Sequence, residues 1–326
     1  MIKFYESHFE DYIIANQALD LHPKLDKVFE KFPGSLCKLR NFILYGPSGV
    51  AKYTQMLKAI KKYSPTELKY EKKLQITYNK QEYNFKISDI HYEIDMAILG
   101  CNSKLLWHDI YQQIVDSISA KQDKTGIIVC KNFHEIHNEL LEGFYSYMQE
   151  NNPTIMDIKY ILLTEQVSFI PDNIINCCEI IGIPRPTKIS YTKCSKSLNQ
   201  DIKPEQITNI KLIHNNNTNN NEILSNLSHP YKIICDKIIK EMISKEDIKF
   251  VKFRDLLYEI FIYNLDINDC IWYILTNLIN DSNITKNMSQ ILIKTYNFLQ
   301  YYNNNYRPIY HLESYLLYLV KVINGY

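Results

Sequence analysis

A glycine-rich run followed by a lysine is the part of this sequence whose residue types can do chemistry. Gly46, Gly49 and Lys52 have the spacing of a loop whose backbone N–H groups hold phosphate oxygens while the lysine reaches them. Ala51 replaces the last glycine expected, and Tyr53 replaces the hydroxyl that would hold Mg²⁺. The run therefore predicts a degenerate nucleotide site, made of Gly46, Pro47, Ser48, Gly49, Ala51, Lys52, Tyr53 and Thr54.

The second place where chemistry is expected is the end of an apolar strand at residues 126–130, which is followed by Lys131 and Asn132. ATP hydrolysis in such a layout needs one acid for Mg²⁺ and another group to position the attacking water. An ammonium group repels the metal ion, and an amide is not a base. We therefore expect no catalytic residue and no metal site, and either no cofactor or weakly bound ATP or ADP. A residual ATPase that uses another acid, such as Glu135 or Glu165, stays an alternative.

The elements that must position these residues follow from the hydrophobic pattern. Apolar runs alternate with helical spacing over residues 1–187, which predicts an α/β domain with a parallel sheet. We expect strands or extended segments at 42–45, 68–77, 83–94, 126–130, 160–164 and 179–183. We expect helices at 53–60, 105–118 and 139–149.

After Pro186 the pattern becomes entirely helical. We expect a short helical lid at residues 188–241, with an Asn-rich surface loop at 215–221, and a helical collar domain at 242–326. The helices expected from residue 230 onward are 231–243, 247–263, 267–280, 284–301 and 309–323.

Composition limits the classes of protein that remain. Of the 326 residues 46% are hydrophobic, and the net charge is +1, so total charge gives no argument for nucleic-acid binding. Eight cysteines without zinc-type pairing, and no signal peptide, predict free thiols in a reducing intracellular compartment. No apolar run has the roughly 18 residues that a membrane helix needs, so we expect no membrane contact.

Several segments, in the same order, resemble the small subunits of replication factor C, the AAA+ sliding-clamp loader. The family's loop GPSGAGKKT corresponds to residues 46–54, its YHLEV strand to 91–95, and its LILCCN and IPPIRSRC stretches to 160–165 and 170–178. Its AIYHLEAF helix corresponds to residues 308–315, and a collar helix to 253–259. The likeness is greatest to the family's non-hydrolysing subunit.

This resemblance also shows departures. The family's sensor asparagine falls at Glu165, and the arginine that reaches a neighbour's ATP falls at Cys177. No box that packs near adenine is recognisable in residues 4–18, and the paired DNA-contact arginines fall near Glu142 and Gly143. The resemblance implies the architecture and an assembly role, without ATP turnover.

We therefore expect a catalytically inactive clamp-loader-like subunit that serves as a scaffold in DNA replication. Its implied partners are other loader-like subunits, through the C-terminal collar, and also a sliding clamp and primer–template DNA. The implied location is the nucleus or, for a large DNA virus, a factory in the host cytoplasm, because the composition suggests an AT-rich genome. A structural or virion protein that reuses a degenerate AAA+ fold stays an alternative.

Overall fold

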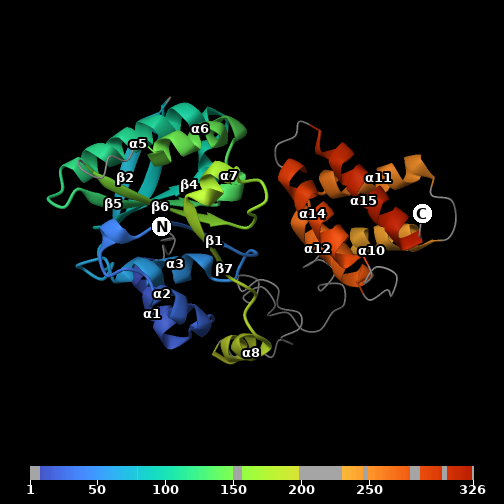
Figure 1. Cartoon of the computed structure of the whole chain (residues 1–326), viewed down its shortest axis with the longest axis horizontal. Coiled ribbons are helices and arrows are strands. Elements are labelled where there is room, and N and C mark those ends of the chain that lie inside the picture. The colour runs from blue at the N-terminus through green and yellow to red at the C-terminus, as the bar shows by residue number, and fades with distance from the viewer. Residues whose placement is uncertain are drawn as a thin grey trace, which may run out of the picture. The chain divides into compact units, whose positions relative to one another are not determined.

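The computed structural model describes residues 8–78, 80–149, 156–197, 230–244, 249–279, 287–302 and 307–324. The chain divides into two compact units at residues 216 and 217 (Figure 1). The expected Asn-rich loop at 215–221, and most of the expected lid, lie outside the described residues.

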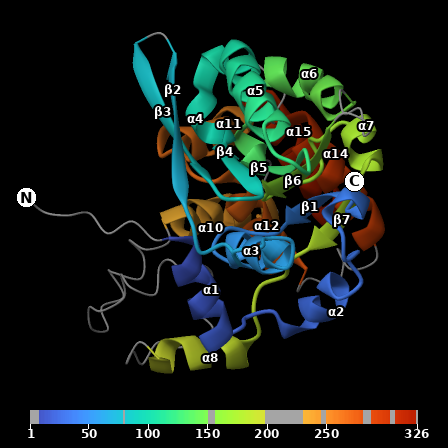
Figure 2. The ribbon, with the colours of Figure 1, turned by 90° about the vertical axis from the view of Figure 1, so that its left-hand side faces the viewer.

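The first unit is built on a seven-stranded sheet with the order β2-β3-β4-β5-β6-β1-β7. Strands β4, β5, β6, β1 and β7 are parallel to one another, whereas β2 and β3 add an antiparallel hairpin (Figure 2). The strands are β1 Asn41–Tyr45, β2 Lys72–Tyr78, β3 Gln81–Ile87, β4 His91–Asp95, β5 Thr125–Lys131, β6 Asp157–Thr164 and β7 Cys178–Gly182.

Helices cover both faces of this sheet, with α5 and α6 on one side and α1 to α3 on the other (Figure 1). The helices of this unit are α1 Phe9–Ala18, α2 Asp26–Phe29, α3 Lys52–Lys61, α4 Met96–Leu99, α5 Ser103–Ser119, α6 Asn138–Gln149, α7 Asp172–Asn176 and α8 Lys188–Ser197. Short 3₁₀ turns lie at Pro23–Leu25, Leu36–Lys38, Gly100–Asn102 and Phe133–Glu135.

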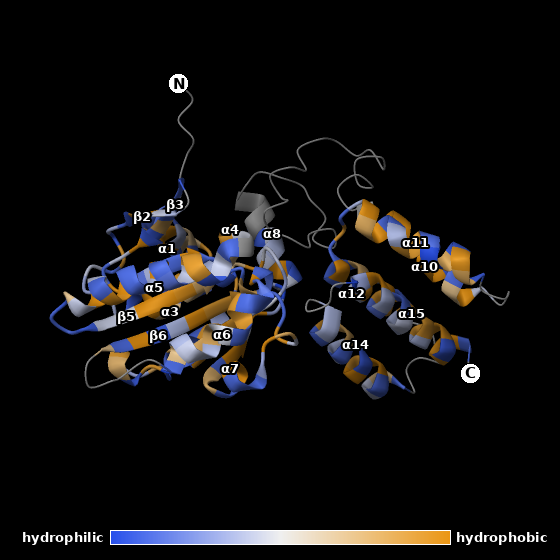
Figure 3. Ribbon diagram, turned by 90° about the horizontal axis from the view of Figure 1, so that it is seen from above, coloured by the Kyte–Doolittle hydropathy of each residue, from blue (hydrophilic) through white to orange (hydrophobic). Residues whose placement is uncertain are grey.

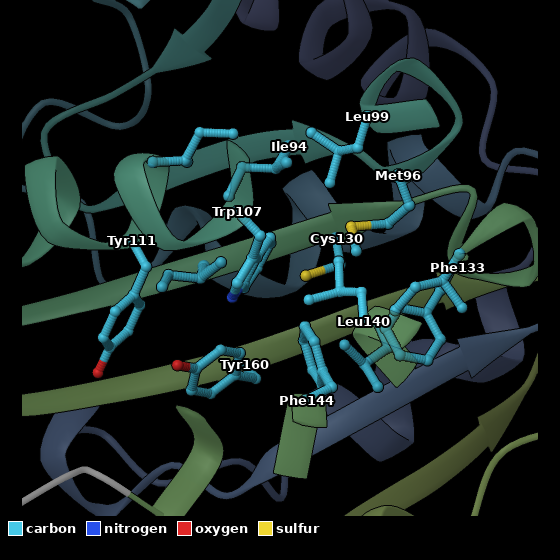
Figure 4. Packing of buried hydrophobic residues seen from close by; sticks show 14 of the residues in the cluster. Ile94, Met96, Leu99, Trp107, Tyr111, Cys130, Phe133, Leu140, Phe144 and Tyr160 are labelled. Carbon is cyan, nitrogen blue, oxygen red and sulfur yellow. The ribbon is translucent and has the colours of Figure 1, made fainter. Parts of the chain in front are cut away.

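The central strands are continuous apolar runs because both of their faces are buried. Successive residues of β5 alternate between the two cores: Ile128 packs with α5 and α6, and Val129 packs with α3. Figure 4 shows Trp107, Phe144 and Tyr160 filling the core beneath α5 and α6. These two cores fix the carboxyl ends of β1, β4 and β5, where the expected site residues lie.

The second unit is entirely helical and has its own core. Its described helices are α10 Pro230–Ile243, α11 Phe250–Ile262, α12 Ile267–Leu278, α14 Met288–Tyr302 and α15 Pro308–Asn324. Figure 3 shows hydrophobic and hydrophilic residues alternating along these helices, as amphipathic packing requires. Arg254 of α11 donates two hydrogen bonds of 2.9 Å to the Glu313 carboxylate of α15, which pins these two helices together.

Most of the elements expected from the sequence are confirmed within three residues, but two extended segments differ, and the first of them begins at Lys72 instead of residue 68. The segment expected to be extended over 83–94 is two strands, because Ser88 Oγ accepts the N–H groups of Ile90 and His91 and turns the chain there. Helix α10, which falls within the expected lid segment, packs in the core of the second unit through Ile234, Cys235 and Ile238.

Candidate nucleotide site

The loop between β1 and α3 keeps a glycine-type backbone although one of its glycines is missing. Gly49 has φ 66°, and Ala51, the residue before the first helical residue, has φ 65° and ψ 31°. This left-handed conformation is unfavourable for an L-residue by roughly 1–2 kcal/mol, because Cβ approaches the following carbonyl. Ala51 is therefore held there by the surrounding structure, and the turn that presents the helix N-terminus is retained.

Gly46 is required by close contact between the loop and the neighbouring strands. A Cβ atom on Gly46 would lie 2.2 Å from the carbonyl oxygen of Ile183. The Gly46 N–H donates to the carbonyl of Thr164 at 3.3 Å, and Ile183 N–H donates to Tyr45 O at 2.7 Å. The start of the loop is thus fixed by the carboxyl ends of β6 and β7.

Lys52 is turned back over its own loop. Its ammonium donates to the carbonyl oxygens of Gly46 at 2.6 Å and Pro47 at 2.8 Å. It also lies 3.6 Å from a carboxylate oxygen of Glu165, and both side chains are largely buried. The lysine expected to reach a phosphate therefore lies at the loop, and the residue at the expected sensor position lies beside it.

Ser48 and Thr54 complete the expected loop residues. Ser48 lies in the turn before α3, and Thr54 lies in the first turn of that helix.

The buried His22 also contacts the loop, since its Nε2 lies 2.8 Å from the carbonyl oxygen of Val50. Burial is the main reason that the pKa of His22 is lowered, so the neutral ring predominates at pH 7.

Tyr53 and Lys131, expected separately from the sequence, meet on one buried carboxylate. The Tyr53 hydroxyl donates to Oε1 of Glu93 at 2.6 Å, and the Lys131 ammonium donates to Oε2 at 3.2 Å. The ammonium also lies 5.6 Å from the centre of the Tyr53 ring. The Glu93 side chain has no exposed surface, and that of Lys131 is 29% exposed. The two positions expected to face a metal ion are therefore both bonded to one internal carboxylate.

A fourth side chain, His91, completes this cluster. Its Nε2 lies 3.3 Å from Oε1 of Glu93, and its Nδ1 lies 2.5 Å from the hydroxyl of Ser88. Burial alone raises the pKa of the Glu93 carboxyl. The hydrogen bond with His91 and the charge of Lys131 lower it by more than burial raises it, so the pKa lies below its ordinary value of 4.5. Glu93 is therefore ionised at pH 7. Burial and the Glu93 charge raise the pKa of the Tyr53 phenol, which stays a proton donor.

The remaining expected residues lie apart from this cluster. Asn132 has a left-handed backbone with φ 50°, and its amide donates to Asp95 Oδ1 at 2.9 Å. Cys177 lies just before β7, at the end of the sheet opposite the loop, beside a cavity that Arg40 and Asn41 also line. Burial raises the pKa of its thiol. The structure therefore places Cys177 away from the loop and turns the Asn132 amide toward Asp95.

Glu93 is the functional residue that our sequence reasoning missed. The sequence placed it within a strand but gave it no role. The available signal was a charged residue between Tyr92 and Ile94 in a strand with four buried residues, since such a charge needs partners. Among the described residues, no group of three or more His, Cys, Asp or Glu side chains is arranged to hold a metal ion.

Mg²⁺ does not fit the residues present. It requires oxygen ligands in near-octahedral geometry at about 2.0–2.1 Å. Both oxygens of Glu93 already accept hydrogen bonds, from Tyr53 and Lys131, and the cationic Lys131 would repel the ion.

Comparison with known proteins gives only distant structural similarity. No protein-family profile and no curated protein matches the chain. Among solved structures, a point variant of RuvB from Thermotoga maritima is 12% identical, with a TM-score of 0.33, over 62% of this chain and 57% of that chain. A second T. maritima RuvB, described as a Holliday junction branch migration motor, has the same identity and TM-score over 61% and 56%. Rif2 of Saccharomyces cerevisiae is 12% identical, with a TM-score of 0.36, over 71% and 80%.

The chain spans a little over half the length of the RuvB chains that it matches, and these scores carry no argument about activity. The fold class expected from the sequence is confirmed by the chain's own architecture. It has an α/β unit in which the loop follows β1, between β6 and β7, and an all-α unit follows it in the chain. None of the described helices combines the length and the apolar character needed to span a membrane.

Proposed function

We propose that this protein is an AAA+-like subunit that does not hydrolyse ATP and serves as a scaffold in a sliding-clamp-loading assembly. The observation that carries the proposal is the Glu93 carboxylate, which holds Tyr53 and Lys131 at 2.6 and 3.2 Å. Both groups occupy positions that a hydrolysing enzyme uses for its metal ion. The engagement of both groups by Glu93 supports the loss of the metal-assisted step from this site.

The proposal also rests on the residue that would activate the attacking water. Asn132, which follows β5, is an amide that donates to Asp95, so it offers no base for a nucleophilic water. Glu165 and Glu135 are the acids considered as substitutes. Glu165 lies 3.6 Å from the Lys52 ammonium, and Glu135 is paired with His134 at 3.8 Å. The Glu165 carboxylate is therefore placed beside Lys52, and that of Glu135 beside His134.

The assembly role draws support from the second unit. Its helices present large apolar side chains to solvent, including Ile262, Tyr263, Ile293 and Tyr301. Large exposed apolar side chains are of the kind that protein–protein interfaces cover. In the proposal these helices contact other loader-like subunits, and the assembly acts on a sliding clamp and primer–template DNA. In the proposal the assembly works in the nucleus or in a viral factory.

Two measurements on the full-length protein test this proposal. Phosphate release from ATP with Mg²⁺ should equal that of the Lys52→Ala variant, because neither protein has a catalytic centre. Purification of the tagged protein from its native cells should recover loader-like subunits and a clamp. Turnover that is lost in Lys52→Ala would identify an ATPase, and recovery of capsid or other structural proteins would identify a virion role.

A further inference from the structure

The ion pair between Lys131 and Glu93 carries an inference about the ligand of the loop. Lys131 lies at the carboxyl end of β5, and its ammonium contacts the same carboxylate as Tyr53, the residue that follows Lys52 in α3. Glu93 uses only one of the three N–H bonds of this ammonium. With 29% of the Lys131 side chain exposed, the charge is anchored by Glu93 and still reaches solvent.

We propose that Lys131 replaces the divalent cation at this site, so that the loop binds the polyphosphate group of a nucleotide as the metal-free anion. This inference rests on the proposed function, because it assigns the ligand of the same non-hydrolysing site. Three positive features lie at or beside the start of α3: the N-terminus of the helix, the ammonium of its first residue Lys52, and the ammonium of Lys131, which is 5.6 Å from the ring of Tyr53.

Charge explains why a metal ion is excluded while a polyphosphate is accepted. A Mg²⁺ ion near Lys131 adds like charge and has no unused carboxylate oxygen on Glu93. A phosphate oxygen instead gains charge-assisted hydrogen bonds from the lysines. Glu165 opposes the anion from 3.6 Å beside Lys52, which limits the affinity. Bound Mg²⁺ also neutralises part of the anion's charge, so the metal complex should bind more weakly.

Calorimetric titration of the full-length protein with ADP and with inorganic pyrophosphate tests the inference. We expect binding in EDTA, and an affinity that is unchanged or several-fold weaker in excess Mg²⁺. Lys131→Met should weaken binding in EDTA about tenfold. Lys104→Met, which removes the same charge from an exposed position on α5, should leave binding unchanged. Absence of binding at millimolar ligand, or binding that requires Mg²⁺, overturns the inference.

Electron paramagnetic resonance with Mn²⁺ provides a readout that does not depend on nucleotide affinity. The native protein should leave Mn²⁺ free in solution, whereas the double variant Tyr53→Ser, Lys131→Asp should bind the ion. Binding by the native protein overturns the inference. A double variant that has a native urea transition but still excludes Mn²⁺ also overturns it. These outcomes are distinct from ATP turnover or different partners, which would contradict the proposed function alone.

Discussion

The hydroxyl of Tyr53 lies 2.6 Å from Oε1 of Glu93, and this single hydrogen bond joins the first turn of α3 to the middle of β4. The two residues are 40 positions apart in the sequence. The helix that begins at the phosphate-type loop is thereby tied to a strand that is separated from β1 by β5 and β6. Tyr53 therefore has a structural role at a position where a nucleotide site would use a metal ligand.

Replacing Tyr53 with Phe should destabilise the protein by about 1.5–3 kcal/mol, because the buried, charged carboxylate of Glu93 then loses the hydrogen bond that Tyr53 donates. The measurement is urea unfolding at pH 7. Tyr63→Phe is a matched control, since that hydroxyl donates at 2.7 Å to the neutral carbonyl of Pro33 and should be worth only about 0.5–1.5 kcal/mol. Equal losses in the two variants would show that the Glu93 charge is not important for this bond.

Glu93 should also contribute to the pH dependence of stability. Its pKa in the folded protein lies below the ordinary value of 4.5, so its stabilising effect is present above that pH. The effect is lost as the pH falls from about 4.5 through the folded-state pKa. Glu93→Gln should therefore cost about 1.5–3 kcal/mol at pH 7 and progressively less in acid.

Urea unfolding of both proteins between pH 7 and pH 3 gives the difference between them directly. Other carboxyls with lowered pKa, such as Asp20 and Asp89, are common to the two proteins and cancel in this difference. A difference that stays constant down to pH 3 would mean that the pKa of Glu93 is not lowered in the folded protein.

Ala51→Gly should stabilise the protein by about 1 kcal/mol, because glycine adopts φ 65° without the Cβ contact that Ala51 suffers. The larger freedom of glycine in the unfolded chain offsets part of this gain. The opposite sign is expected for Ala59→Gly, in the middle of α3, which should cost at least about 1 kcal/mol. A rise in thermal midpoint for the first variant and a fall for the second would confirm the assignment.

Gly46→Ala should be strongly destabilising, because its new methyl group would lie 2.2 Å from the backbone oxygen of Ile183. Overpacking of this kind costs about 1–3 kcal/mol or more, since a strand end has to move. Gly143 in α6 is the matched control, because nothing lies within 4 Å of a Cβ atom there. Gly143→Ala should be neutral or stabilising by about 0.5–1 kcal/mol, and loss of stability comparable to Gly46→Ala would contradict the steric explanation.

The sequence allowed the order of the main elements to be predicted because their apolar patterns are long and regular. The run 42–45, the helix after it and most of the amphipathic helices from residue 230 were expected within three residues. The short helix α7, and α1, whose apolar residues follow no single helical face, gave no comparable signal. Their positions are decided by packing on the sheet, which a linear pattern does not contain.

The types of the residues at the candidate site could be predicted from the sequence, but the contacts between them could not. The replacements at Tyr53 and Lys131 were visible in the sequence, and each was interpreted as the loss of a metal ligand. That both side chains end on Glu93 depends on the order β4-β5-β6-β1, which brings segments 40 and 38 residues from Glu93 to one place. Only the three-dimensional arrangement shows that the two changes compensate each other.

The position of β1 inside the sheet has a consequence for synthesis of the chain. Tyr45 pairs with Thr164 on one side and with Gly182 on the other, and the latter is 137 residues further along the chain. At about 5–20 residues per second, a ribosome needs about 7–30 s to supply that second partner. Until those strands are made, Phe42, Ile43 and Leu44 lack the neighbours that bury them in the sheet, so the nascent chain exposes this apolar segment until β6 and β7 emerge.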